Sequence, residues 1–191
     1  MAGMISKAEL RRSVREKINL IAPSDLAEKS ARICKAIASR PEWRQARTVC
    51  LFAPHSHEPA VDALWRHIGD KQVCYPRVAG SRLDLLFVRD LSELKTSRWN
   101  LREPEYAPEN LASLENIDVL LVPGVAFSRD GGRLGRGGGF YDRLLAEPRL
   151  RAWKIGVCFD AQLVAEVPSE AHDRGVDAVV TEGGVALSER G

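Results

Sequence analysis

Gly131-Gly132-Arg133-Leu134-Gly135-Arg136-Gly137-Gly138-Gly139-Phe140-Tyr141-Asp142-Arg143 is the stretch that most constrains the fold of this 191-residue chain. It interleaves six glycines with arginines and stops at a helix-like run that begins at Phe140. Glycine permits close backbone approach, so successive N–H groups can converge on an anion at the start of the next helix, and arginine adds charge and paired donors. The stretch therefore predicts a phosphate-binding loop between a strand and a helix.

The sequence on either side of this glycine segment supports that prediction. Residues 117–122 form an apolar run that ends at Pro123, which indicates a buried strand feeding the loop. Asp142 lies just beyond the glycines, and Mg²⁺ in proteins usually binds one or two carboxylates together with substrate phosphates. A flexible surface linker is the alternative interpretation, but such linkers are usually padded with serine rather than arginine.

Two well-known glycine signatures do not match. The chain has no G-x-x-x-x-G-K-[ST] loop, and Gly135-x-Gly137 is followed by Phe140 where a dinucleotide fingerprint needs a third glycine. The segment is neither a Walker loop nor a dinucleotide-binding loop.

The composition predicts an ordinary soluble protein with one domain over residues 1–191. Hydrophobic residues make up 45% and charged residues 28% of the chain, and no apolar run approaches the roughly 20 residues of a membrane-spanning helix. The net charge of +2 gives no strong basic excess, so we expect no nucleic-acid partner and no membrane association. The first 15 residues lack the apolar core of a secretory signal, so the expected location is the cytoplasm. We also expect the protein to be a monomer.

The cysteines and histidines do not form a metal-binding pattern. Cys34, Cys50, Cys74 and Cys158 are scattered in apolar stretches and contain no C-x-x-C pair, so we expect them to be reduced residues of the core. The four histidines do not complete a zinc site with them.

Helical and extended patterns alternate along the chain. Ser6-Lys7-Ala8-Glu9 matches a capping box at the start of a helix over residues 7–20, and Pro23-Ser24-Asp25 begins a second helix that runs to about Ser39. A further helix is expected over residues 61–68 and another after Phe140, whereas residues 90–114 read as irregular. The expected strands lie at residues 48–53, 72–75 (closed by Pro76), 83–88, 117–122, 154–159 and 176–181. This order predicts an α/β fold with a mainly parallel central sheet flanked by helices, in a Rossmann-like layered architecture.

Ligands of such sheets bind outside the carboxyl ends of the strands. Three polar or glycine-containing segments follow predicted strands: residues 55–58, 123–142 and 159–162. We expect them to lie together.

Several of these residues resemble the signature of one family. The runs Pro123–Phe127 and Gly132–Arg143 closely resemble the signature of the 5-formyltetrahydrofolate cyclo-ligases, also called methenyltetrahydrofolate synthetases. The resemblance extends from Lys7 to Thr181. It includes Lys7-x-x-x-Arg11, Glu58, Leu101-Arg102-Glu103-Pro104, Ile155-Gly156-Val157 to Gln162, Pro168 and His172-Asp173-x-x-Val176-Asp177.

The family resemblance implies an ATP-dependent reaction. A cyclo-ligase converts 5-formyltetrahydrofolate, with one glutamate or a polyglutamate tail, to 5,10-methenyltetrahydrofolate, and releases ADP and phosphate with the help of Mg²⁺. The expected cofactor is therefore Mg²⁺, and ATP is a co-substrate. Phosphorylation of the formyl oxygen would make the formyl carbon electrophilic, so that a neighbouring folate nitrogen can close the ring and expel phosphate. Such catalysis depends mainly on positioning and charge neutralisation.

The resemblance also implies roles for individual residues. Arg136 would stabilise charge on the transferring group, Glu58 would orient the pterin, and Asp142 and Asp173 would bind magnesium directly or through water. The expected ATP-binding residues are Lys7, Arg11, Arg133, Leu134, Gly135, Arg136, Gly137, Gly138, Gly139, Phe140 and Tyr141. The expected substrate-binding residues are Glu58, Arg136, Gly137, Gly138, Gly139 and Phe140.

Bland interpretations of the same residues remain open. Lys7 and Arg11 could also form a solvated basic face of a helix. Glu58 could be an acid at a helix N-terminus, and Tyr141 could be an aromatic residue of the core. His55 and His57 lie beside Glu58, but nothing in their spacing requires catalysis, so they are not assigned to it.

This chain departs from the family pattern at two places. Phe140 stands where many members have tyrosine, which removes a hydroxyl contact. The spacer Pro59-Ala60-Val61 between Glu58 and Asp62 is longer than usual and leaves the alignment of Asp62 open.

Other functions remain as alternatives. A diverged family member could bind nucleotide as a regulator or act on another substrate. An RNA-binding module is disfavoured by the near-neutral charge and the 6% aromatic content, and a dinucleotide oxidoreductase by the incomplete fingerprint.

Overall fold

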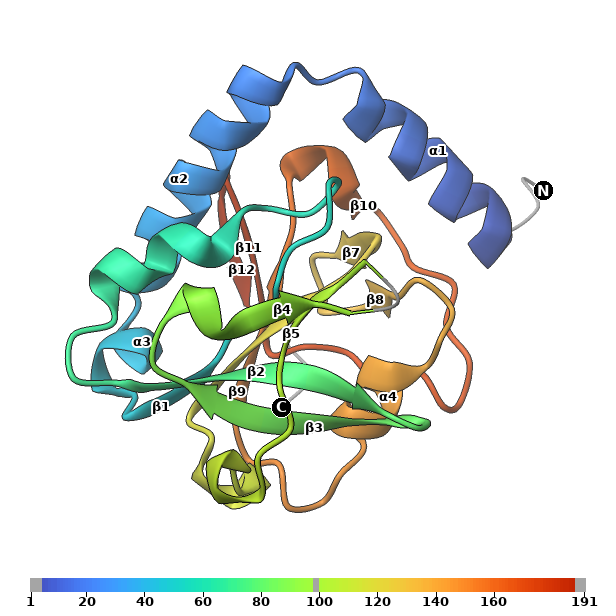
Figure 1. Ribbon diagram of the computed structural model, residues 1–191. Helices are drawn as coiled ribbons and strands as arrows, with labels where there is room; N and C mark the ends of the chain where they lie inside the picture. The colour runs from blue at the N-terminus through green and yellow to red at the C-terminus, as the bar shows by residue number, and fades with distance from the viewer. Residues whose placement is uncertain (1–4, 98–99, 188–191) are drawn as a thin grey trace.

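A computed structural model describes residues 5–97 and 100–187. Its centre is a sheet with the strand order β12-β11-β9-β6-β1-β2-β3 (Figure 1). The five inner strands are parallel, and the two edge strands β3 and β12 pair antiparallel with β2 and β11. The sheet strands are β1 (Thr48–Cys50), β2 (Gln72–Ala79), β3 (Arg82–Val88), β6 (Val119–Pro123), β9 (Trp153–Val157), β11 (Ala178–Thr181) and β12 (Gly184–Leu187). The predicted α/β fold with a mainly parallel sheet is confirmed.

Both faces of the sheet are buried, because alternate residues of the inner strands point to opposite sides. Val119 and Leu121 of β6 belong to one apolar cluster, and Leu120 and Val122 belong to the other. An all-apolar run such as residues 119–122 is therefore what a central parallel strand requires.

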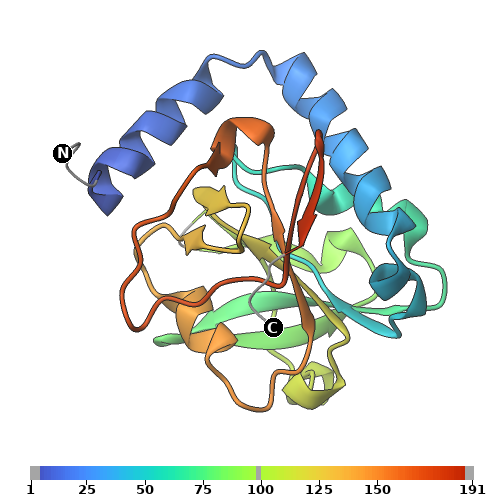
Figure 2. The same cartoon turned by 180° about the vertical axis from the view of Figure 1, so that it is seen from behind.

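Helices cover the two faces unequally. α1 (Lys7–Asn19), α2 (Pro23–Ser39), α3 (Pro41–Gln45) and the 3₁₀ helix η1 (Val61–His67) all contribute to the first cluster. α4 (Phe140–Leu145) packs into the second through Leu144 and Leu145. Figures 1 and 2 show α1 and α2 meeting at an angle on one side of the molecule, with α4 at the other.

The first two helices begin and end close to their predicted bounds. Ser6 caps α1, since its hydroxyl accepts from the Glu9 amide and the Glu9 carboxylate accepts from the Ser6 amide, which confirms the capping box. Leu10, Val14 and Ile18 form the buried face of α1. The helix predicted at 61–68 is a 3₁₀ helix instead.

Two strands do not end where the prolines in the sequence predicted. The β1 ladder stops at Cys50 rather than at Ala53, so Phe52 and Ala53 are free to line a pocket. β2 does not stop before Pro76 but continues to Ala79, with Pro76 opposite Leu85 of β3. Pro76 is tolerated because β1 has already ended beside Cys74, so the missing N–H group faces no partner strand.

Irregular segments contain short pairs that the sequence pattern did not predict. β4 (Leu94–Thr96) pairs with β5 (Arg102–Pro104) inside the region predicted as irregular. β7 (Ala126–Ser128) pairs with β8 (Arg133–Leu134) and β10 (Leu163–Val164), so a small three-stranded sheet stands between β6 and the glycines. The remaining 3₁₀ helices are η2 (Leu91–Glu93), η3 (Pro108–Asn110), η4 (Leu114–Asn116) and η5 (Asp160–Gln162).

The four cysteines are buried and free, as predicted from their apolar surroundings. In the part of the chain that the structure describes, no helix combines the length and the apolar character that crossing a membrane requires.

Candidate functional site

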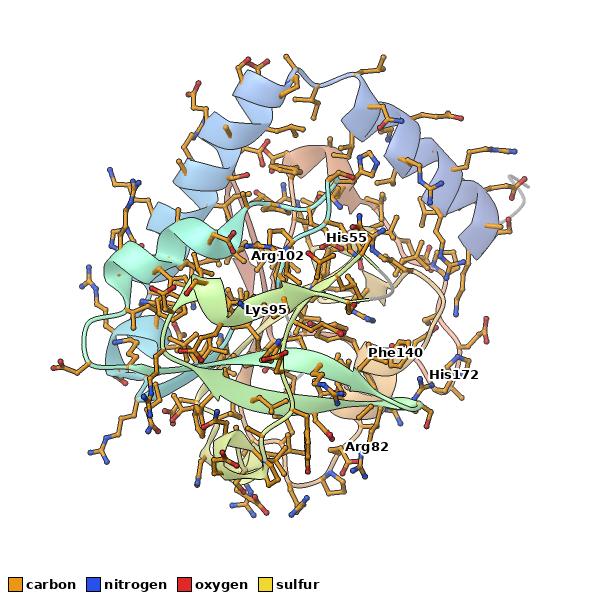
Figure 3. The ribbon with its side chains drawn as sticks, in the orientation of Figure 1. His55, Arg82, Lys95, Arg102, Phe140 and His172 are labelled. Carbon is orange, nitrogen blue, oxygen red and sulfur yellow. The ribbon has the colours of Figure 1, made fainter. Side chains whose placement is uncertain are left out.

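A pocket of about 480 Å³ lies outside the carboxyl ends of β1 and β6, where the sequence predicted ligand binding. Figure 3 labels three of its lining residues, His55, Arg102 and Phe140, which come from three separate segments. Its walls combine apolar side chains with a few charged ones, as in many small-molecule sites. The lining residues are Phe52, Ala53, His55, Glu58, Pro76, Val78, Leu83, Leu101, Arg102, Glu103, Pro123, Gly124, Arg133, Gly135, Arg136, Gly138, Gly139, Phe140, Tyr141 and Asp142.

Glu58 and Arg136 meet in this pocket although they are far apart in the sequence. Arg136 donates from Nη2 and Nε to Glu58 Oε1, at 2.9 and 3.1 Å. Glu58 Oε2 accepts from the His55 amide at 2.9 Å. The Glu58 side chain is 5% exposed and that of Arg136 45% exposed, so a desolvated carboxylate is paired with an accessible guanidinium.

Arg133 is a buried side chain of the glycine segment. Its side chain is 3% exposed, and it donates to the Pro123 carbonyl at 3.2 Å and to Asp142 Oδ1 at 3.1 Å. Burial lowers the pKa of Arg133, and the Asp142 charge opposes this change. Its contacts indicate that Arg133 supports the loop and orients Asp142, in addition to any contact with a phosphate.

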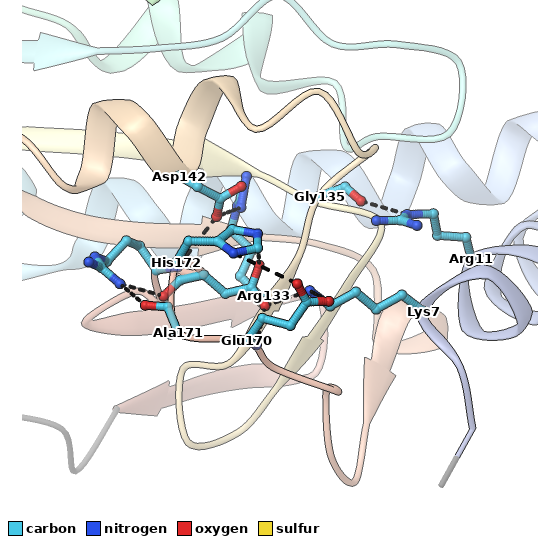
Figure 4. Close-up of polar contacts among 10 residues, drawn as sticks. Lys7, Arg11, Arg133, Gly135, Asp142, Glu170, Ala171 and His172 are labelled. Carbon is cyan, nitrogen blue, oxygen red and sulfur yellow. Dashed lines mark hydrogen bonds and ion pairs between the residues drawn. The ribbon is translucent and has the colours of Figure 1, made fainter.

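Lys7 and Arg11 both reach the glycine side of the site from α1 (Figure 4). Lys7 Nζ lies 2.7 Å from Asp173 Oδ2 and 2.9 Å from Glu170 Oε1, and Arg11 Nε donates to the Gly135 carbonyl at 2.9 Å. Burial disfavours the charged forms of Lys7 and Asp173, but the hydrogen bonds and charges of their neighbours together outweigh it, so the pKa of Lys7 is raised and that of Asp173 is lowered. Neither Lys7 nor Arg11 lies on a purely solvated face.

The residues of the glycine segment differ in how far their side chains are accessible to a ligand. Leu134 is 2% exposed and packs in the core, so only its backbone is available to a ligand. Gly139 has φ of 67° at the start of α4, a left-handed conformation that favours glycine. Tyr141 is partly buried against the second cluster, with its ring 5.6 Å from Arg133 Cζ, and burial raises its pKa well above the usual value. Of residues 133–142, Leu134 and Gly137 do not line the pocket.

α4 is shorter than the prediction required, with only six residues. So short a helix adds little dipole, and anion binding at this loop would depend on backbone N–H groups and basic side chains.

Asp142 and Asp173 suit a cation that is held mainly by a nucleotide. Asp142 lines the pocket with a side chain that is 16% exposed, and its Oδ1 accepts from Arg133 and from the Arg174 amide at 3.4 Å. Over residues 5–97 and 100–187, no group of three or more His, Cys, Asp or Glu side chains could hold a metal ion by itself. Carboxylates in ones or twos are the usual protein ligands of Mg²⁺ bound to phosphates, so Asp142 and Asp173 have the right chemistry, but Asp173 is paired with Lys7 and does not line the pocket.

The third predicted segment, residues 159–162, supports the site without lining the pocket. Gln162 is 2% exposed and donates from Nε2 to the carbonyls of Gly124 and Val125, both at 3.1 Å. Its Oε1 accepts from the Phe159 amide at 2.9 Å. Gln162 therefore holds the turn that leads from β6 into the glycine segment.

Sequence reasoning missed one wall of the pocket. Pro76, Val78 and Leu83 come from the β2–β3 hairpin, and Arg102, which pairs with Asp62 at 2.6 Å, comes from β5. The Gly80-Ser81 turn between two apolar runs was the available signal for a hairpin, but nothing in its spacing points toward the glycine segment.

Comparisons with known proteins identify the family of this chain. The sequence profile of the 5-formyltetrahydrofolate cyclo-ligase family matches residues 4–182. The chain is 33% identical over 176 residues to the 5-formyltetrahydrofolate cyclo-ligase of Escherichia coli K12, covering 88% of this chain and 96% of that one. It is 28% identical over 197 residues to a probable 5-formyltetrahydrofolate cyclo-ligase of Schizosaccharomyces pombe, covering 93% and 95%.

A solved structure shares the fold as well. The 5,10-methenyltetrahydrofolate synthetase of Aquifex aeolicus superposes with a TM-score of 0.84 at 31% identity, covering 98% of this chain and 95% of that chain. With the profile match over nearly the whole length, this likeness confirms the resemblance seen in the sequence. The chain belongs to the 5-formyltetrahydrofolate cyclo-ligase family.

Proposed function

We propose that this pocket carries out the ATP-dependent conversion of 5-formyltetrahydrofolate to 5,10-methenyltetrahydrofolate, with release of ADP and phosphate. The observation that carries the proposal is the meeting of Glu58 and Arg136 at a pocket with one apolar wall and one glycine wall. A flat pterin needs apolar contact and a carboxylate that accepts from its N–H groups, and a triphosphate needs N–H groups and cations.

Glu58 and the apolar wall would hold the folate. The carboxylate has four lone-pair directions, and Arg136 and the His55 amide account for three contacts at its two oxygens. One direction at Oε2 stays open to a pterin N–H group, and a second such group would have to replace Arg136 at Oε1. Phe52, Leu83 and Phe140 supply apolar surface on the same pocket.

The glycine segment would hold ATP from the opposite side. Lys7 and Arg11 would bind its phosphates, together with the backbone of residues 133–139 and the residues Phe140 and Tyr141. Arg11 is bonded to the Gly135 carbonyl, and Lys7 is held by Glu170 and Asp173 in a segment that is bonded to Asp142 through the Arg174 amide, so both cations lie beside the proposed ATP site. Asp142 and Asp173 would hold Mg²⁺, which supplies charge neutralisation on the transferring phosphate when bound.

The proposed placement is compatible with the following reaction. The formyl oxygen would attack the γ-phosphorus of ATP, ADP would leave, and the carbon that bears the phosphorylated oxygen would become electrophilic. The second folate nitrogen then attacks that carbon and loses its proton, and the carbon–oxygen bond breaks so that phosphate departs with the formyl oxygen. Arg136 has an accessible guanidinium that reaches Glu58, and in this proposal it would neutralise charge on the phosphoryl group as it passes between the two substrates.

Several expectations from the sequence remain predictions. They are the single domain over residues 1–191 (whose ends lie outside the described residues), action as a monomer in the cytoplasm, and the absence of nucleic-acid or membrane partners. Acceptance of polyglutamylated folate is also untested. Size-exclusion chromatography with light scattering would test whether the protein is a monomer. Kinetics on folate substrates with one and with several glutamates would test the acceptance of a polyglutamate tail.

The activity is tested by following the near-ultraviolet absorbance of methenyltetrahydrofolate after mixing the protein with 5-formyltetrahydrofolate, ATP and Mg²⁺. We expect a rise that needs ATP. No rise from folded protein that binds ATP would contradict the proposal and favour a regulator or a different substrate.

A further inference from the structure

Arg143 joins the turn between β2 and β3 to residues 138–140 of the glycine segment. Its Nε donates to the Ser81 carbonyl at 2.6 Å, in the turn between β2 and β3. Its Nη2 donates to the Gly138 carbonyl at 2.9 Å, and its Cζ lies 5.2 Å from the centre of the Phe140 ring. From this geometry we propose that Arg143 is a positioning residue, which fixes the folate side of the pocket by tying the β2–β3 hairpin to the glycine segment.

Because Arg143 lies in the last turn of α4, its simplest role would be to stabilise the C-terminus of that helix, but its contacts do not match this role. A cation in the last turn of a helix is normally stabilised by the carbonyls at the helix C-terminus. Arg143 does lie in the last turn of α4, but its guanidinium reaches back past the helix start to Gly138 and across to the hairpin. Apart from its contact with the Phe140 ring, which belongs to α4, the guanidinium therefore binds residues outside its own helix.

Every part that Arg143 holds belongs to the pocket. Gly138 and Phe140 line it directly, and the hairpin contributes Val78 and Leu83. A planar guanidinium can serve two carbonyls and a ring face at once, because its donors point in fixed directions. Arg143 therefore sets the spacing between the hairpin and the start of α4.

The ATP side of the site has anchors of its own. Arg11 holds the Gly135 carbonyl, and buried Arg133 holds the Pro123 carbonyl and Asp142. Gly138 and Phe140 belong to both expected binding sets, but the nucleotide side keeps these other anchors, so loss of Arg143 should loosen the folate wall more than the nucleotide wall. Because the Arg143 side chain is exposed, its removal should cost the fold little, which separates a positioning role from a general loss of stability.

The inference rests on the proposed function for its kinetic test, but its structural test does not. The variants are Arg143→Met, Arg143→Lys and the control Arg82→Met. Arg82 lies on the same hairpin, contacts only Asp84 of its own strand among the described ion pairs, and has a side chain that is 76% exposed. Hydrogen–deuterium exchange of ligand-free protein should speed up in residues 79–83 and 137–141 of Arg143→Met, and not in those of Arg82→Met.

In kinetics, Arg143→Met should raise KM for 5-formyltetrahydrofolate about tenfold, with KM for ATP changed less than about twofold and kcat less than about threefold. Arg143→Lys should restore part of the loss, since one ammonium can reach one carbonyl but cannot bridge both. A KM for folate equal to that of wild type, or equal exchange in Arg143→Met and Arg82→Met, would overturn the inference. If the wild-type protein lacks cyclo-ligase activity, the proposed function fails and the exchange result alone decides the role of Arg143.

Discussion

Arg136 Nη2 lies 2.9 Å from Glu58 Oε1, so the arginine of the glycine segment is paired with the acid that follows β1. The Glu58 side chain is 5% exposed, and this pair links the expected ATP side of the pocket to its expected folate side. Binding of one substrate should therefore alter the site of the other.

Arg136→Ala should lower kcat about a hundredfold, because it removes a donor from the transferring group. It also leaves a buried carboxylate without its partner, so the free energy of unfolding should fall by about 1–3 kcal/mol. Absorbance kinetics and urea unfolding measure the two effects. In a Glu58→Gln background, Arg136→Ala should lower the free energy of unfolding by less than it does in the wild-type protein. An equal loss in both backgrounds would show that the Glu58–Arg136 pair contributes nothing to stability.

Asp142→Asn should raise the magnesium concentration needed for half-maximal activity about tenfold, because one of the proposed carboxylate ligands loses its charge. The variant also removes the partner of buried Arg133, so activity must be compared at a temperature where it remains folded. Asp70→Asn, at an exposed position, is the control. Identical magnesium titrations for Asp142→Asn and wild type would remove Asp142 from the metal site.

Lys7→Met should raise KM for ATP about tenfold and leave KM for folate nearly unchanged, because Lys7 is a proposed phosphate ligand. Lys17→Met on the same helix changes the same charge at an exposed position and should leave both constants unaltered. Initial-rate kinetics over a matrix of both substrates measures the split. Equal effects of the two lysine variants would indicate a general charge effect in place of a contact.

His55 should titrate below its ordinary pKa of 6.5, because burial and the Arg136 charge both disfavour the imidazolium. As the pH falls through 6.5 the unfolded chain takes up the proton before the folded one, so stability from this residue decreases on the acid side. NMR titration of the His55 ring in Arg136→Ala should give a higher midpoint than in wild type. An unchanged midpoint would exclude the Arg136 charge as a cause.

Gly156→Ala should lower the free energy of unfolding by about 1–3 kcal/mol through overpacking. A Cβ atom at Gly156 in β9 would lie 2.5 Å from Phe127 Cε1 and 3.1 Å from Val176 Cγ2. Urea unfolding measures the change. In a Phe127→Leu background, which opens space beside Gly156, Gly156→Ala should lower the free energy of unfolding by less than in the wild-type protein. An equal loss in both backgrounds would mean that Phe127 is not the obstacle.

The sequence by itself determined the α/β class, because apolar runs such as residues 119–122 and capped helices such as α1 are local patterns. It also identified the glycine segment and the family, since a spaced run of glycines and arginines is unusual enough to be read without a fold. It failed at Pro76, where tolerance of a missing N–H group depends on how far the neighbouring strand β1 extends.

Only the tertiary structure decided which side chains meet. Glu58 and Arg136 are 78 residues apart, and Arg143 and Ser81 are 62 apart, so no local period or spacing relates them. The same is true of the burial of the Arg133 side chain and of the placement of the hairpin along the pocket. Such pairings depend on the order of parallel strands and on the packing of two cores, which are properties of the whole chain and not of any segment.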